Sequence, residues 1–111
     1  MPRHTNVFLQ NVFGDFFSRR QTMIQEYVTI KNKAGLHTRP AAVITKIASK
    51  YKSSITLERN GMNVNAKSII GVMTLAAEQY AQLVLTIEGN DEQEAFKEML
   101  EYFDAGFNEA M

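Results

Sequence analysis

The order of strand-like and helix-like segments is the feature that most constrains how this chain can fold. From Met23 onward, apolar residues alternate with polar residues in some segments and recur every three to four residues in others. Alternation places one face of a strand against a core, whereas the longer period places one stripe of a helix there. Residues 23–104 therefore predict the order strand, helix, strand, strand, helix, strand, helix.

The strand-like segments can be bounded by turn residues. Four segments have the period of a strand, namely residues 24–30, 55–57, 62–66 and 83–87. Asn60-Gly61 stands between the second and the third of these segments, and Gly89 follows the fourth. Because Asn-Gly is the strongest short signal of a β-hairpin, we expect the second and third strands to pair in antiparallel fashion.

Three helix starts can be placed from capping residues. Pro40 suits the first turn of a helix, where its missing N–H leaves no hydrogen bond unmade. Ser68 can cap the second helix. Asp91, with Glu94 three residues later, resembles a capping box and predicts the start of the third helix. Since each helix has one apolar stripe, we predict an α+β domain of two layers, with three helices on one face of a four-stranded sheet.

The composition excludes several classes of function. The 111 residues include no cysteine, which excludes a disulfide framework, a thiol nucleophile and cysteine-based metal sites. The two histidines, His4 and His37, are too few for a histidine-rich metal site, so we expect no metal. Neither glycine-rich nucleotide motif, G-x-x-x-x-G-K-[ST] or G-x-G-x-x-G, occurs, and we expect no other cofactor. No apolar run approaches the roughly 18 residues that a membrane span needs. We therefore expect one globular domain that does not insert into a membrane.

Residues 1–22 differ from the rest of the chain. An apolar stretch is followed by Arg19 and Arg20, whereas a secretory signal carries its positive charge before the apolar stretch. An amphipathic surface helix is an alternative. We expect residues 1–22 to be a dispensable extension, disordered or the product of a misassigned upstream start, and residues 23–111 to form the domain.

Charge is divided unevenly along a chain whose formal net charge is zero. Residues 1–76 hold 11 basic and 3 acidic side chains, whereas residues 77–111 hold 1 basic and 9 acidic side chains. Such a split can mark a face that meets a partner. A nucleic-acid partner is not expected, because an RNA-binding sheet needs exposed aromatic residues and the strands offer Tyr27 as the one clear candidate.

The segment Gly35–Ala41 carries the main candidate for chemistry. His37 stands where a loop meets the start of a helix, and Arg39 follows two residues later. Free backbone N–H groups and the helix dipole make such a start an anion site, and an arginine adds donors suited to phosphate oxygens. The dipole also favours a neutral, nucleophilic imidazole. These features suggest a histidine that accepts a phosphoryl group. The alternative is a histidine that merely decorates a loop.

Two motifs resemble those of a known family. The stretch GLHTRPAA at residues 35–42 resembles the active-site motif of HPr, the histidine-containing phosphocarrier protein of the bacterial phosphotransferase system, and residues 65–73, NAKSIIGVM, resemble its regulatory-site motif. The resemblance implies an open-faced β-sandwich and a stoichiometric phosphoryl carrier, not an enzyme. It further implies a cytoplasmic monomer in which His37 accepts the group from phosphorylated enzyme I, ultimately from phosphoenolpyruvate. Arg39 would neutralise the phosphoryl oxygens before the group passes to enzyme IIA-type acceptors.

The second motif implies regulation and docking. By the resemblance, Ser68 would be modified by an HPr kinase/phosphorylase, and Thr38, Ile69, Ile70 and Met73 would contact partners. A phosphate on an N-cap serine suits the positive end of a helix but would repel an acidic partner. The alternative for Ser68 is an N-cap serine that is never modified. The alternative for Ile69, Ile70 and Met73 is that they belong to the core, although consecutive positions of a short helix cannot all face inward.

The family branch stays open at this point. Where the family often carries a glycine turn before the fourth strand, this chain has residues 78–81, EQYA. The ending at residues 103–109, FDAGFNE, looks more like the nitrogen-related NPr branch. Both a carrier for sugar uptake and a regulatory phosphorelay or protein-interaction module without sugar transport are therefore consistent with the sequence.

Overall fold

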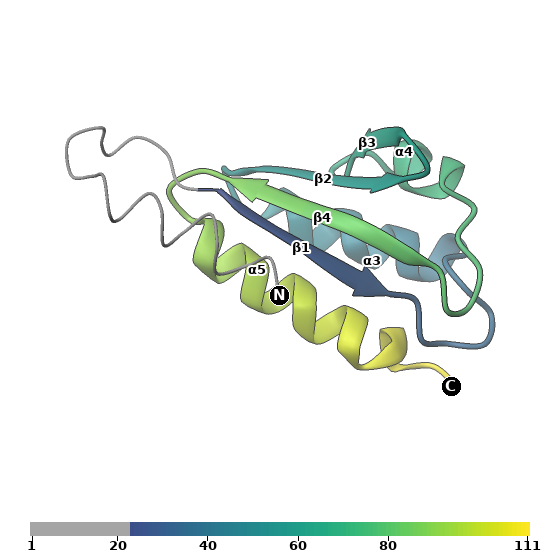
Figure 1. Ribbon diagram of the computed structural model, residues 1–111. Helices are drawn as coiled ribbons and strands as arrows, with labels where there is room; N and C mark the ends of the chain where they lie inside the picture. Colours follow the sequence, from purple (N-terminus) through teal and green to yellow (C-terminus); the bar gives the residue numbers. More distant parts are fainter. Residues whose placement is uncertain (1–22) are drawn as a thin grey trace.

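The computed structural model describes residues 23–111, so the expectations for residues 1–22 lie outside the described part of the chain. The helices and strands follow the predicted order (Figure 1). They are β1 (Ile24–Thr29), α3 (Thr38–Ser49), β2 (Ser54–Arg59), β3 (Met62–Asn65), α4 (Ile69–Thr74), β4 (Gln82–Glu88), α5 (Glu92–Asp104) and a 3₁₀ helix, η1 (Gly106–Asn108). The predicted α+β class is confirmed, and η1 is an addition to the predicted elements.

The four strands form one antiparallel sheet in the order β1-β4-β2-β3. The hairpin between β2 and β3 turns at Asn60 and Gly61, whose φ angles of 52° and 85° are those that an Asn-Gly turn adopts. Helices α3 and α5 run along one face of the sheet, and α4 lies beside α3 near the end of β3 (Figure 1). No helix of residues 23–111 covers the other face, so the sandwich is open.

The alternation of side chains along each strand builds the core between the sheet and the helices. In β1, Ile24 and Val28 are buried, whereas Gln25 and Tyr27 are exposed on the other face. Burying one such aliphatic side chain contributes about 1.5–3 kcal/mol. The helices supply the opposing side chains, chiefly Ile44, Ile47, Val72, Met99 and Phe103.

The helix starts predicted at Ser68 and Asp91 both agree with the structure, but the two residues cap their helices differently. The Ser68 hydroxyl accepts a hydrogen bond from the Gly71 N–H at 3.1 Å, which confirms the predicted N-cap of α4. Asp91 is the N-cap residue of α5, as predicted, but the capping box is not formed. Its carboxylate instead accepts hydrogen bonds from the N–H groups of Lys52 and Ser53, so it ties the segment just before β2 to the start of α5.

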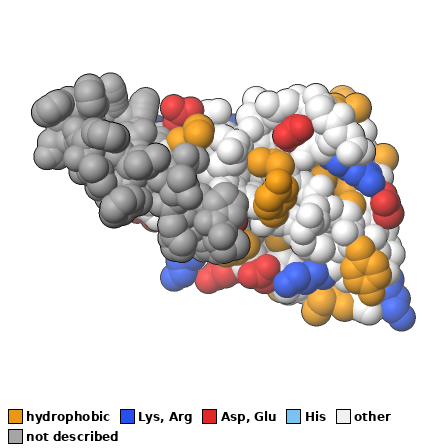
Figure 2. Space-filling model, viewed as in Figure 1, with side chains coloured by type: hydrophobic (Ala, Val, Ile, Leu, Met, Phe, Trp, Pro, Cys, Tyr) orange, Lys and Arg blue, Asp and Glu red, His pale blue; other side chains and the backbone are white. Residues whose placement is uncertain are grey.

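The uneven charge along the sequence is partly balanced by ion pairs within the fold. Each ion pair recorded within residues 23–111 joins a cationic side chain from the basic part of the chain to an acidic one from residues 77–111. The pairs are Lys31–Asp104, His37–Glu109, Arg39–Glu109, Lys50–Glu98 and Arg59–Glu78. On the face shown in Figure 2, basic and acidic side chains accordingly lie interspersed along the lower edge.

Two later segments of the chain brace the loop that leads from β1 to α3. The segment before β4 donates the Tyr80 N–H to the Ile30 carbonyl at 2.6 Å, and its Ala77 carbonyl accepts the Leu36 N–H at 2.8 Å. The C-terminal segment returns to the same loop, where the Lys33 N–H donates to the Ala110 carbonyl at 2.9 Å. These contacts place the end of the chain beside the histidine motif.

Candidate functional site

His37 lies at the N-cap of α3, where the loop after β1 becomes helical. Its backbone is extended, with φ and ψ of −96° and −169°, so His37 itself stands just before the first helical turn. Gly35 makes this loop possible, because its φ is +76° and a Cβ there would lie 2.8 Å from the Ala77 carbonyl oxygen. Leu36 is buried, whereas the His37 side chain is 39% exposed. The histidine is therefore fixed at its backbone and accessible at its ring.

The start of α3 offers backbone donors beside the ring. The first N–H groups of a helix have no intrahelical acceptor. Pro40 lies in the first turn and has no N–H, and the Ala41 N–H already donates to the His37 carbonyl at 3.0 Å. The N–H groups of Thr38 and Arg39 remain, and no hydrogen bond uses them within the described residues. This end of the helix can therefore receive an anion.

The most specific contact of His37 is with Glu109, near the C-terminus. His37 Nε2 lies 3.0 and 2.9 Å from Glu109 Oε1 and Oε2. The hydrogen bond from His37 and a second one from Asn32 hold the pKa of the Glu109 carboxyl below its usual range. An ionised carboxylate can only accept, so Nε2 carries the hydrogen in this arrangement. Nδ1 then has the free lone pair, and it has no hydrogen-bond partner within residues 23–111.

Arg39 lies on the same carboxylate but is held more loosely. Its Nη2 is 3.4 Å from Glu109 Oε2, and its side chain is 72% exposed. Lys33, His37, Arg39 and Glu109 are among the residues that line a shallow hollow at this end of the molecule. Arg39 therefore has donors left to bind oxygens of a group attached to the His37 ring.

The two motifs predicted from sequence occupy neighbouring helices, since α3 and α4 contact one another. Ser68 is exposed at the start of α4, and Thr38 is exposed at the start of α3. The exposed fractions of Ile69, Ile70 and Met73 are 36%, 73% and 40%, whereas Val72 on the same helix is buried. The three side chains therefore lie at the surface, and the core interpretation of them is wrong.

Glu109 and Asn32 are site residues that the sequence did not reveal. Asn32 is fully buried, and its Nδ2 donates to Glu109 Oε1 at 2.8 Å and to the Gly35 carbonyl at 2.9 Å. Glu109 is 72 positions from His37, and no spacing rule joins residues so far apart. The sequence offered only an asparagine between a strand and a glycine loop, and such a residue does not identify its partner.

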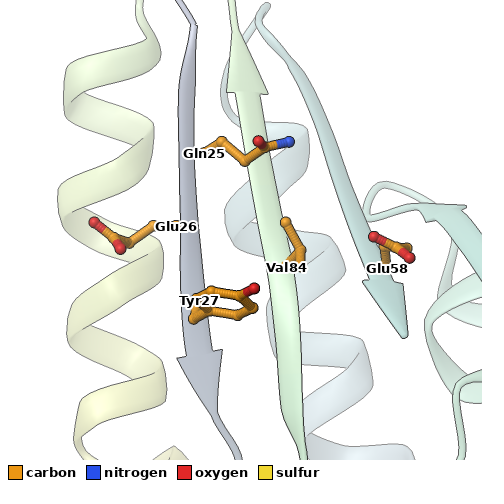
Figure 3. Close-up of a pocket in the computed structure, with 5 residues that line it drawn as sticks. All are labelled: Gln25, Glu26, Tyr27, Glu58 and Val84. Atoms are coloured by element: carbon orange, nitrogen blue, oxygen red, sulfur yellow. The ribbon is translucent and has the colours of Figure 1, made fainter. Parts of the chain in front are cut away.

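A second hollow lies near β1, away from the histidine (Figure 3). Tyr27, Val84 and Glu58 are neighbours across β1, β4 and β2 there, whereas Glu26 points toward α5. One aromatic ring beside a carboxylate is a poor surface for a nucleic-acid backbone. Within residues 23–111, no three His, Cys, Asp or Glu side chains form a group that could hold a metal ion, and no helix has the length and apolarity to cross a membrane.

Comparisons with known proteins identify the family of this chain. The sequence model of the family described as "PTS HPr component phosphorylation site" matches residues 24–105. The phosphocarrier protein HPr of Xylella fastidiosa is 44% identical over 87 residues, which cover 78% of this chain and 98% of that protein. The HPr-like protein Crh of Halalkalibacterium halodurans is 42% identical over 82 residues, which cover 74% and 98%.

The solved structures give the same result. The crystal structure of an HPr from Thermoanaerobacter tengcongensis superposes with a TM-score of 0.75 at 42% identity, covering 78% of this chain and 98% of that one. The family model extends from β1 to the end of α5 and includes the loop before α3 that carries His37. The chain belongs to the HPr family of phosphocarrier proteins of the phosphotransferase system.

Proposed function

We propose that His37 accepts a phosphoryl group from phosphorylated enzyme I, derived from phosphoenolpyruvate, and passes it to enzyme IIA-type acceptors. The observation that carries this proposal is the arrangement of the His37 ring, whose Nε2 contacts the Glu109 carboxylate while Nδ1 is free at the start of α3. A carrier must be a nucleophile that is accessible from two partners in turn. The partly exposed His37 side chain, beside free helix N–H groups, meets that need.

The transfer can be written at the level of atoms. The lone pair of His37 Nδ1 forms a bond to phosphorus, the bond between phosphorus and the donor breaks, and the donor keeps that electron pair. The ring becomes more positive as the bond forms, and the Glu109 carboxylate next to Nε2 stabilises this charge. The phosphoryl oxygens gain donors from Arg39 and from the first N–H groups of α3. Onward transfer reverses these steps on a second partner.

Regulation at Ser68 is the second part of the proposal. A phosphate added there by an HPr kinase/phosphorylase would stand beside exposed Ile69, Ile70 and Met73, which we assign with Thr38 to partner docking. The added negative charge, about −1.5 to −2, would be compatible with the helix start but would repel acidic partners. Ser68 could thereby weaken docking without unfolding the domain. The Ser68→Ala variant should take up no acid-stable phosphate from the kinase and ATP.

A regulatory phosphorelay without sugar transport is the second candidate function. The chain is similar to Crh proteins, one of which, from Bacillus subtilis, is called the catabolite repression HPr, and this similarity supports a regulatory role beside the carrier role. In both cases we infer that the protein acts in the cytoplasm as a monomer and without a cofactor, a metal or a nucleic acid. Light scattering would contradict the monomer if it gave twice the chain mass at working concentrations.

The carrier proposal is tested by following acceptance and onward transfer in one reaction. The protein is incubated with phosphoenolpyruvate and enzyme I, and its intact mass is measured before and after a purified IIA-type acceptor is added. We expect one phosphoryl group that appears on the protein, is lost in acid and moves to the acceptor. His37→Ala should take up none. Equal uptake by this variant, or a group that never reaches any acceptor, would contradict the proposal.

A further inference from the structure

We propose that Tyr80, which lies outside both sequence motifs, is a docking residue whose ring binds enzyme I when that partner meets His37. The proposal rests on the proposed phosphoryl transfer, and it extends the docking surface from α4 to the segment that joins α4 to β4. Its basis is a tyrosine that has a φ of +75°, in the left-handed region, and is 73% exposed. Strained backbone of this kind is concentrated at functional sites.

The fold uses the backbone of Tyr80 but not its ring. The Tyr80 N–H donates to the Ile30 carbonyl at 2.6 Å, and a glycine could donate the same bond. The ring is not part of the hydrophobic core, and it has no aromatic neighbour among residues 23–111. Packing therefore does not account for an aromatic side chain at this position. Tyrosine is, by contrast, enriched at protein interfaces and among the residues that dominate binding.

Arg59, at the end of β2, holds the segment before Tyr80 in place. Its Nη1 donates to the carbonyls of Leu75 and Ala76 at 3.2 and 3.1 Å. Its Nη2 donates to the two carboxylate oxygens of Glu78 at 2.8 and 3.0 Å. A ring carried on a segment fixed at three residues loses little freedom when it binds, so less of its contact energy is lost to ordering.

The same segment lies against the loop that carries His37, at one end of the sheet (Figure 1). Gly35 approaches this segment so closely that a Cβ there would lie 3.2 Å from the Glu78 Cα. His37 and Tyr80 each stand two residues beyond this contact, so their Cα atoms are at most about 20 Å apart. A standard interface covers about 800 Å² of each partner, a patch roughly 30 Å across. An interface that includes His37 is therefore wide enough to include Tyr80.

The charges around His37 indicate the chemistry of the partner surface. Arg39 is 72% exposed, and exposed Lys33 lines the same hollow without an ion pair within residues 23–111. A complementary partner presents carboxylates to these cations and an apolar pocket to the tyrosine ring. We assign that partner to enzyme I, because the sugar-uptake carrier and the regulatory phosphorelay both begin with transfer from this donor.

The test uses the full-length protein as the substrate of a catalytic amount of enzyme I with phosphoenolpyruvate. Initial rates of phosphorylation over a range of protein concentrations give KM and kcat for each variant. Tyr80→Gly should raise KM about fivefold or more at an unchanged kcat, because the lost contact is with the docked partner and not with the transferred group. Tyr80→Asn, whose new side chain also tolerates a positive φ, should behave in the same way. Tyr80→Phe should keep the wild-type KM because the ring remains.

Two control variants separate the ring from its surroundings. Ala76→Gly changes the other left-handed residue of the segment, with φ of +47°, without removing a ring. Tyr27→Ala removes a tyrosine that is 58% exposed on the open face of the sheet. Both should keep the wild-type KM. Titration calorimetry with unphosphorylated enzyme I should give a Kd that rises in Tyr80→Gly by the same factor as KM.

The outcomes separate this proposal from the proposed function. Unchanged KM and Kd in Tyr80→Gly and Tyr80→Asn, both folded by circular dichroism, overturn the proposal and leave the carrier function standing. An equal rise of KM in Ala76→Gly or Tyr27→Ala also overturns it, because the effect would then not belong to the Tyr80 ring. A loss seen only in transfer to a IIA-type acceptor overturns the assignment to enzyme I. A wild-type protein that takes up no phosphoryl group refutes the proposed function, and the calorimetric Kd still decides whether Tyr80 binds enzyme I.

Discussion

Tyr80 occupies a backbone conformation that suits glycine, so replacing it by glycine should stabilise the domain. Its φ is +75°, in the left-handed region, which costs a residue with a Cβ roughly 1–2 kcal/mol. Tyr80 is 73% exposed in the folded domain. Because side chains are already partly covered in the unfolded chain, folding buries almost no additional surface of this ring and gives almost no stabilisation from burial. Glycine would keep the N–H that donates to the Ile30 carbonyl.

The size of the effect follows from two opposing terms. Relief of the left-handed strain favours the variant, whereas the greater freedom of glycine in the unfolded chain opposes it by about 0.5–1 kcal/mol. The net gain for Tyr80→Gly is therefore about 0.5–1 kcal/mol, or roughly 3–6 °C in Tm for a domain of this size. Ala76, with φ of +47° just after α4, offers the same test without the loss of a ring.

The assay is thermal and urea unfolding of Tyr80→Gly and Ala76→Gly beside Ala42→Gly. Ala42 is exposed within α3, so glycine there should cost about 1 kcal/mol. The urea m-value should stay constant across the set, since none of these changes alters the surface that unfolding exposes. If glycine at residues 76 and 80 destabilises the domain as much as glycine at residue 42, the account of strain in this turn is refuted.

Three further predictions concern the site and its supports. Arg39→Ala should slow phosphoryl acceptance about tenfold without changing Tm, because one charge-assisted hydrogen bond to the phosphoryl group is lost. An unchanged single-turnover rate would contradict the role that we assign to Arg39. Ser68→Ala should lower stability by about 1 kcal/mol in urea unfolding, because the Gly71 N–H loses its cap; an unchanged midpoint would show that the cap contributes nothing. The pKa of Glu109 lies below the usual value of about 4.3, so its stabilising contribution is present above that value and lost as the pH falls through the lowered pKa. Stability of Glu109→Gln should consequently fall less than that of the wild type between about pH 5 and pH 3, and parallel curves would contradict this assignment.

The sequence predicted those features that depend on neighbouring residues. Alternation along β1 and the Asn60-Gly61 turn reflect local backbone preferences, as does the cap at Ser68, and all three appear in the structure. The His37 loop was recognisable because its glycine, histidine and arginine lie within five residues. Local pattern therefore sufficed for the order of elements and for singling out His37, the residue that we propose as the nucleophile.

Features that depend on tertiary contacts were missed. Asp91 has the spacing of a capping box, but its carboxylate accepts two N–H groups from the segment just before β2 instead. Glu109 reaches His37 only because η1 and the packing of Phe107 turn the chain back after α5. Within residues 23–111, the fold likewise pairs basic side chains with acidic ones from the later part of the chain, which sequence position alone does not show.

The central claim is that His37 carries the phosphoryl group, and site mapping tests it most directly. The protein is phosphorylated with phosphoenolpyruvate and enzyme I, digested at neutral pH and fragmented by a method that keeps the labile N–P bond intact. We predict that the phosphoryl group maps to His37 and that no other residue of the chain carries it. A group mapped to Ser68 or to any other residue, or a digest without a phosphorylated peptide, would contradict the account.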